Sequence, residues 1–157
     1  MPPKTERTDK KEVEAIVLDY LQWGYAGDKR PLNQREPIIL AVGTDQFKLL
    51  ELIAKKDKAI NLHDTVYIGD GERKVVERVK RRVSFAELTP TAKGELEPAV
   101  AEIIAASEER FVEFYNTAVP VSLKMHMLNL LPGFGKKTLT DTLTEREKKP
   151  FESFADI

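Results

Sequence analysis

Residues 65–85, "TVYIGDGERKVVERVKRRVSF", give the clearest indication of the fold in this sequence. Two runs rich in β-branched residues flank Gly69-Asp70-Gly71, residue types that tolerate the positive φ angles of a tight turn. The segment predicts a long β-hairpin. Because strand side chains alternate between faces, its second strand is predicted to pack through Val75, Val79 and Val83 and to present a cationic face of Lys74, Arg78, Lys80 and Arg82.

Three stretches upstream are also predicted to be strands. Residues 13–21, "VEAIVLDYL", and residues 36–43, "EPIILAVG", are rich in β-branched and other apolar residues. Residues 47–56, "FKLLELIAKK", have a mixed pattern, which we interpret as a strand because they directly follow a short turn. Four to five twisted strands are too few for a sandwich and would leave exposed edges as an open sheet. Residues 13–84 are therefore predicted to close into a small β-barrel.

Downstream of the strands, the sequence has the pattern of helices. Residues 84–87 fit a capping box, residues 89–90 fit a helix start, and Pro98 is predicted to open a further helix. Apolar residues between positions 100 and 115 recur at helical spacing, so one buried stripe and a solvated, Glu-rich face are expected. Residues 120–131, "PVSLKMHMLNLL", predict a short, mostly buried helix. The predicted fold class is therefore α+β, with a helical region over residues 85–157.

Composition limits the classes of protein to which these elements can belong. The chain has 157 residues, of which 41% are hydrophobic, and it has no cysteine. Disulfides, thiol nucleophiles and cysteine-bearing zinc sites are therefore excluded, which favours a reducing compartment. No apolar run approaches the roughly 20 residues of a membrane span, so we expect a globular, cytoplasmic protein. Residues 1–12 are polar and charged and are predicted to form a mobile tail.

The formal net charge of −1 conceals an uneven distribution along the chain. Residues 71–83 contain six basic and two acidic side chains, and residues 119–149 contain six basic and three acidic ones. Between them, residues 85–118 contain seven acidic and two basic side chains. Two basic segments separated by an acidic one predict localised contacts with anionic partners.

The second basic segment contains "NLLPGFGKKTLTDTL", residues 129–143, in which a glycine-rich turn separates two apolar runs. Two glycines in such a turn let the main chain approach a ligand without an intervening side chain. Phe134 is predicted to anchor the turn to the core. Free amides at the start of the following helix attract anions, and a phosphate oxygen fits that requirement. The predicted backbone contacts are Gly133, Gly135, Lys136 and Lys137.

This pattern resembles the helix-hairpin-helix motif of sequence-nonspecific nucleic-acid-binding proteins, here over residues 120–147. The resemblance implies phosphate contacts that position the protein without reading base sequence. It also implies a monovalent cation at the hairpin, and no other cofactor is expected. Such motifs usually occur in pairs, and many carry a small residue where this chain has Leu139. We therefore expect that the helical region is truncated and that a second hairpin follows residue 157.

The order of a small barrel followed by this motif resembles an archaeal family of unknown function, described as predicted OB-fold nucleic-acid-binding proteins. The resemblance implies an OB-like barrel and nucleic-acid binding, and it extends over nearly the whole chain. Its landmarks here are "GDKRP", "LLELIAKK", "VYIGDGERK", "ELTPTAKGELEPAV", "LPGFGKK" and "PFESF".

Several candidate residues have a structural interpretation beside the functional one. Trp23 and Tyr25, and less strongly Tyr67, are candidates for stacking on bases, although aromatic residues of small barrels are more often part of the core. The basic strand face is either a contact surface or an ordinary solvated edge. His63 and His126 are interpreted as structural or solvent-facing rather than metal-binding, because they lack nearby acidic ligands in the sequence. We find no catalytic motif and expect neither enzymatic activity nor a metal site.

The sequence therefore predicts a nucleic-acid-binding protein, with RNA favoured over DNA and a role related to translation or the ribosome. One alternative is binding of structured DNA in repair or recombination. Another is a protein-interaction adaptor, in which the acidic helix and residues 120–131 dock a partner and the hairpin only turns the chain.

Overall fold

The computed structural model describes residues 10–157, so residues 1–9 of the expected tail lie outside the described part. Glu12, at the end of that expected tail, is buried. The chain divides into two compact units, one ending at Glu102 and the other comprising Ile103–Ile157. Each unit is considered by itself below.

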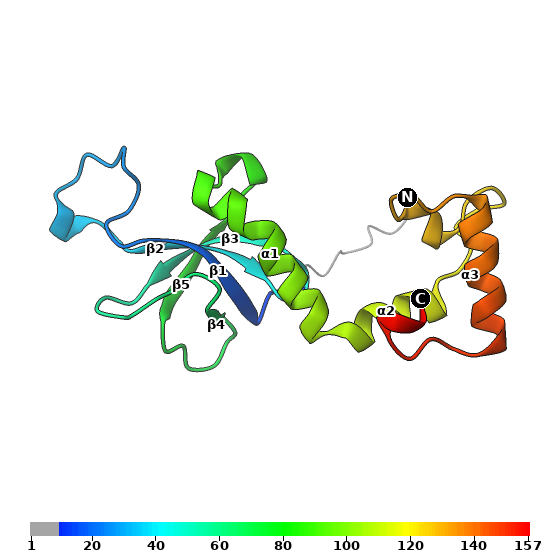
Figure 1. The fold of residues 1–157 in the computed structure, drawn as a ribbon. Helices are drawn as coiled ribbons and strands as arrows, with labels where there is room; N and C mark the ends of the chain where they lie inside the picture. Colours follow the sequence, from blue (N-terminus) through cyan, green and yellow to red (C-terminus); the bar gives the residue numbers. More distant parts are fainter. Residues whose placement is uncertain (1–9) are drawn as a thin grey trace, which may run out of the picture. The chain divides into compact units, whose positions relative to one another are not determined.

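The first unit is a curved five-stranded antiparallel sheet, a half-barrel (Figure 1). Five strands were predicted upstream of residue 84, three in separate stretches and two in a hairpin, and all five are present. The sheet order is β4-β1-β2-β3-β5. The strands are β1 (Glu14–Leu21), β2 (Ile38–Gly43), β3 (Leu49–Ala54), β4 (Thr65–Tyr67) and β5 (Val76–Arg82).

The predicted hairpin between β4 and β5 is wrong. β4 pairs with β1 and β5 pairs with β3, so the two strands lie at opposite edges of the sheet. Gly69 and Gly71 do not have positive φ angles. Instead, a Cβ on either glycine would lie 2.5–2.8 Å from the Tyr67 hydroxyl, which accepts a hydrogen bond from the Gly71 amide at 2.9 Å. These glycines make room for the Tyr67 ring rather than for a hairpin turn.

The expected alternation of side chains along β5 is also wrong, because the pairing of β5 with β3 contains two irregularities. Each adds a residue to β5 and shifts the following side chains to the other face. Val76, Val79 and Arg82 therefore lie opposite Ala54, Leu52 and Leu50. The basic residues of this segment do not form one continuous cationic face, since strict alternation requires an unbroken ladder.

Both faces of the sheet bury apolar side chains, which explains why β2 is buried at every position. The inner face of the half-barrel carries one core cluster, which includes Val17, Ile39, Leu52 and Val76. The opposite face buries Leu18, Leu40 and Ile53. In Figure 1, helix α1 (Pro90–Ala106) lies along the sheet, and the hydroxyl of Thr89, which precedes it, donates to Asp19 of β1 at 2.6 Å.

Helix α1 is also joined to the β3–β4 connection by His63. The His63 Nε2 atom is bonded to the Glu95 carboxylate, and Nδ1 lies 3.0 Å from a Glu102 carboxylate oxygen without the geometry of a hydrogen bond. Glu95 and Glu102 are seven residues apart, and hence on one side of the helix. The bond to Glu95 above all, and then Glu102, raise the pKa of His63. His63 thus has a structural role, as expected, although its acidic partners were not visible in the sequence.

We predict that this histidine makes the stability of the first unit depend on pH. Because its pKa is raised in the folded state, its stabilising contribution is complete below the unfolded-state pKa of about 6.5 and is lost as pH rises through the folded pKa. His63→Asn suits the φ of 67° at this position, since asparagine tolerates this conformation. Urea unfolding at pH 6 and at pH 9, followed by Trp23 fluorescence, should show a pH-dependent loss of stability in the wild type that the variant lacks. An equal pH dependence in both proteins would contradict the assignment.

Two helix predictions are wrong. Pro98 does not open a helix but lies inside α1, which is continuous from Pro90 to Ala106. A proline inside a helix costs one hydrogen bond and clashes with the carbonyl four residues earlier, yet burial of Ala92 and Ala99 on either side favours the helix. Residues 120–131 form a turn closed by a bridge between Pro120 and His126, followed by the 3₁₀ helix Met127–Leu130. Val121, Leu123 and Met125 of this stretch are exposed.

The second unit contains helices α2 (Glu108–Thr117) and α3 (Lys136–Lys148) and a final 3₁₀ turn, Phe154–Asp156. Arg146 of α3 donates to the carbonyls of Tyr115 and Ala118, at 3.1 and 2.8 Å, and so caps the end of α2. Asn116 and Phe151 exchange two hydrogen bonds of 2.8 Å. None of the helices within residues 10–157 has the length and apolar composition needed to cross a bilayer.

Candidate functional site

The predicted glycine turn is present as a short connection between the 3₁₀ helix Met127–Leu130 and α3. Gly133 has a φ of 77°, a conformation that side chains of L-residues disfavour. Gly135 is the N-cap of α3, with extended backbone angles open to any residue. A Cβ on either glycine would meet no atom within 4 Å. The two glycines therefore border open space, as a surface that receives a ligand requires.

The start of α3 leaves backbone donors for such a ligand. No side chain caps this terminus, a statement confined to the described residues 10–157. The first amides of an α-helix have no partner within the helix, and the helix dipole gives them partial positive charge. Lys136 and Lys137 are exposed beside them and add two full charges. Phe134 is half-buried between the glycines, and its role as an anchor stays a prediction.

Asn129 holds the turn in this shape. Its side-chain oxygen accepts from the His126 amide at 2.9 Å, and its side-chain nitrogen donates to the Phe134 carbonyl at 3.1 Å. The ring of His126 in turn accepts from the Leu128 amide at 3.1 Å. His126 is thus a buried structural residue, as expected. The role of Asn129 was not predicted, because it depends on the turn that replaces the expected helix.

We predict that Asn129→Ala destabilises the turn by about 1–3 kcal/mol, since it leaves a backbone amide and a carbonyl without partners. Hydrogen exchange should show reduced protection of amides in Ile103–Ile157 and unchanged protection of amides in the half-barrel. Asn33→Ala is the matched control, because Asn33 is exposed on the β1–β2 loop. Equal effects of the two substitutions would exclude this role.

The aromatic candidates of the β1–β2 loop have different environments. Trp23 is 53% exposed beside Leu32 and Lys56 in a shallow cavity of about 120 Å³. The Tyr25 hydroxyl is instead bonded to the carboxylate of Glu51. Burial and this bond raise the pKa of Tyr25 to about 12. Trp23 is therefore the accessible aromatic of the pair, whereas Tyr25 is held by the sheet.

Glu51 is a buried carboxylate that the sequence analysis did not single out. Its side chain is 1% exposed, yet it lies on β3 among cations of β5. Arg81 Nε donates to it at 3.1 Å, and Lys80 Nζ lies 3.8 Å away. Arg81 also bonds to Glu87 at 3.2 Å. A glutamate inside the apolar run "LLELIA" opposite a basic run was the signal available in the sequence.

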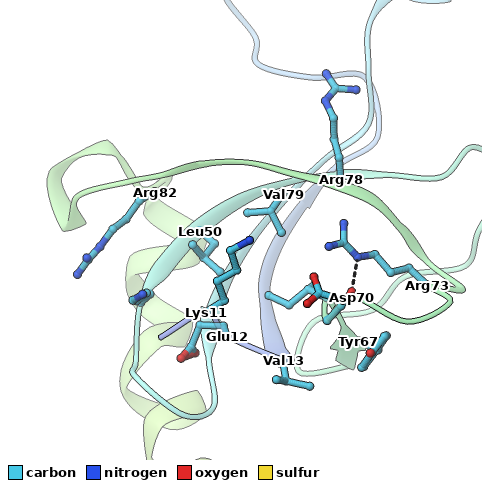
Figure 2. Close-up of a pocket in the computed structure, with 13 residues that line it drawn as sticks. Lys11, Glu12, Val13, Leu50, Tyr67, Asp70, Arg73, Arg78, Val79 and Arg82 are labelled. Carbon is cyan, nitrogen blue, oxygen red and sulfur yellow. Dashed lines mark hydrogen bonds between the residues drawn. The ribbon is translucent and has the colours of Figure 1, made fainter. Parts of the chain in front are cut away.

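The four basic candidates of the β4–β5 segment are dispersed. Lys80 is near Glu51, and Arg78 bonds to both carboxylate oxygens of Glu36 at 3.0 Å. Arg78 and Arg82 line one cavity, while Lys74 lines a second one. Of the four, Arg78 and Arg82 thus share a cavity, and Figure 2 shows their side chains pointing away from each other. The ring of Tyr67, the third aromatic candidate, lies against Gly69 and Gly71 in the loop that follows β4.

The family described as "Protein of unknown function (DUF655)" matches residues 11–157. The chain belongs to this family. It is 43% identical over 155 residues to the uncharacterized protein MJ0038 of Methanocaldococcus jannaschii, covering 99% of this chain and 69% of that protein.

A solved member of the family has a similar fold. The crystal structure of Af1531 from Archaeoglobus fulgidus superposes with a TM-score of 0.86 at 46% identity, covering 92% of this chain and 80% of that one. The expected archaeal resemblance is thereby confirmed at the level of the family. Its description assigns no function, so the site itself has to support one. Within residues 10–157, no group of three or more histidine or acidic side chains is placed to hold a metal ion.

Proposed function

We propose that this protein binds nucleic acid and that Gly133, Gly135, Lys136 and Lys137 contact the phosphate backbone. The start of α3 supports the proposal, because it combines amides without a side-chain cap, open space beside both glycines and two exposed lysines. Backbone amides at a helix N-terminus are suited to a phosphate oxygen. They read no base edge, so the contact is independent of sequence. The turn thus serves as a helix-hairpin-helix motif with a very short first helix.

The half-barrel supports a second contact in the same proposal. We infer that it is OB-like, a fold in which the loop between the first two strands takes part in binding oligonucleotides. Trp23 lies exposed on that loop. An exposed aromatic ring is a platform on which an unpaired base can stack. We favour RNA in the cytoplasm and a binding rather than an enzymatic role, on the family resemblance.

The test is a salt titration of binding. Fluorescence anisotropy would be measured with matched single-stranded RNA and DNA, and with a four-way DNA junction, between 50 and roughly 300 mM KCl. Phosphate contacts predict that log affinity falls linearly with log salt. Replacing Lys136 and Lys137 with glutamine should weaken binding and lower the salt slope by about 1.4 for single strands, since each contact contributes about 0.7.

The outcome separates the nucleic-acid alternatives. Tighter binding to RNA supports the favoured substrate, whereas tighter binding to the junction supports structured DNA. Binding that is absent at 50 mM KCl, or that does not respond to salt, contradicts the proposal. The matched control is Lys148→Gln with Lys149→Gln, a pair of exposed lysines at the other end of α3.

A protein-interaction adaptor is the second candidate, and one observation favours it. Val121 is 60% exposed, and Leu123 and Met125 on the same turn are exposed as well. Exposed apolar side chains close together are typical of interaction surfaces. A protein complex that survives nuclease and 500 mM KCl, and that Leu123→Ser disrupts, would favour the adaptor over the nucleic-acid role.

A further inference from the structure

A cavity of about 790 Å³ opens at the inner face of the half-barrel (Figure 2). This volume is within the range of small-molecule sites. Its walls come from the segment before β1, from β3, from the end of β4 with the loop that follows, and from β5. β4 and β5 are the two edge strands, so the cavity lies where the half-barrel is not closed. The failure of these strands to form a hairpin therefore creates the space.

The floor of the cavity is apolar and continuous with the core. Leu50 and Ile68 are buried members of the inner core cluster. Val79 of β5 also lines the cavity but is 37% exposed, although it lies opposite the buried Leu52. An apolar side chain exposed at the bottom of a cavity offers a surface for the flat face of a ligand.

The walls carry more cations than anions. Five basic residues line the cavity, and the acidic ones are Glu12 and Asp70; the basic set is Lys11, Lys48, Arg73, Arg78 and Arg82. Glu12 is not available to a ligand, because its buried carboxylate accepts from the amides of Asp45 and Gln46 in the β2–β3 turn. The excess of positive charge predicts an anionic ligand.

Three of these cations already have a hydrogen-bond partner. Arg78 is bonded to Glu36, and Lys48 Nζ donates to the Lys10 carbonyl at 2.7 Å. Figure 2 shows that Lys11 and Arg73 extend toward Val79 from different sides of the cavity. Arg73 Nε donates to the Gly69 carbonyl at 2.9 Å, which orients its guanidinium. Asp70 lies below the ends of these two side chains in this view, and its carboxylate is an exposed hydrogen-bond acceptor.

From this arrangement we infer that the cavity binds a nucleotide, with its phosphate between Lys11 and Arg73 and its base against Val79. Asp70 accepts a hydrogen bond from the ribose or from the base. The cations suit a phosphate, the apolar floor suits a planar base, and the acceptor suits a sugar hydroxyl or a base N–H. A nucleotide therefore accounts for all three features of the cavity. The inference rests on the proposed function for the choice of nucleotide over other anions, but it uses no residue of the α3 hairpin.

The inference is tested by NMR titration of the ¹⁵N-labelled protein with AMP, with adenosine and with inorganic phosphate. AMP is expected to shift the amide signals of Gly69, Asp70 and Val79 and to bind at least tenfold more tightly than either fragment. Lys11→Glu should weaken AMP binding at least tenfold. Lys74→Glu is the matched control, because Lys74 is also an exposed lysine of this unit but lies outside the cavity, and it should change the affinity less than twofold.

A second titration, with 5′-phosphorylated oligoadenylate of eight residues, distinguishes a free nucleotide from one unit of a nucleic acid as the ligand. If the oligomer binds more tightly than AMP and Lys11→Glu removes that difference, the cavity holds one unit of a nucleic acid. If the oligomer and AMP bind with equal affinity, the cavity holds a free nucleotide. Shifts confined to the hairpin around Gly135, or equal losses in the two lysine variants, overturn the inference. Gly135→Val serves to separate the two proposals, because it should impair binding at the hairpin and leave AMP binding unchanged.

Discussion

Replacing Glu51 with alanine is expected to lower the free energy of unfolding of the half-barrel by about 3 kcal/mol. The side chain is 1% exposed and accepts from Tyr25 and Arg81, so its removal leaves a cavity and two donors without their acceptor. Breaking a buried ion pair costs about 3–5 kcal/mol. We expect the lower end of that range, because Arg81 is 45% exposed and can be hydrated again. Urea unfolding followed by Trp23 fluorescence measures the change.

Two further substitutions make this prediction specific. Glu36→Ala is the exposed counterpart, since Glu36 bonds to Arg78 of the same strand at the surface, and it should cost only about 0–1 kcal/mol. Glu51→Gln keeps the volume and one acceptor oxygen and should cost less than alanine. If Glu51→Ala and Glu36→Ala have equal effects, the buried carboxylate does not hold β3 to β5.

Gly135→Val is expected to weaken nucleic-acid binding at least tenfold, by the same factor for every sequence, without destabilising the fold. The backbone of Gly135 is extended, and its Cβ would meet no atom within 4 Å, so nothing inside the protein opposes a side chain. A branched side chain there would stand over the amides at the start of α3. Anisotropy with oligonucleotides of unrelated sequence, at one salt concentration, measures the change.

Gly135 is a better position for this experiment than Gly133. The φ of 77° at Gly133 means that any side chain there strains the turn, so a loss of binding would have two explanations. Gly94→Val is the matched control, because Gly94 also borders open space but lies on α1. If Gly135→Val lowers the affinity by different factors for different oligonucleotide sequences, contact between the backbone amides and phosphate is excluded.

The local elements that the sequence predicted correctly are those fixed by short-range patterns. The apolar runs of β1 and β2 and the capping residues before α1 identify their elements wherever these lie in the fold. The turn before α3 was also predicted, because Gly133 and Gly135 lie close together between two apolar runs, a pattern typical of a turn. What these residues bind stays a prediction, since neither the fold nor the family describes a ligand.

In each wrong prediction, contacts that no simple sequence pattern specifies outweighed a local signal. β4 and β5 look like a hairpin, but each is paired with a strand more than 20 residues away. Pro98 looks like a helix start, but the helix continues through it. Residues 120–131 look helical, but Asn129 and His126 satisfy the backbone of a turn instead.

The sequence by itself determined that this chain is a small α+β protein with a basic glycine turn, because residue periodicity, caps and glycines act within a few positions of one another. Only the tertiary structure decided where β4 and β5 go, and with them the cavity and the position of Arg73 across it from Lys11. It also decided that Glu51 is a buried partner of Arg81 rather than an exposed charge. Strand pairing and burial depend on contacts between distant segments, and no local pattern specifies them.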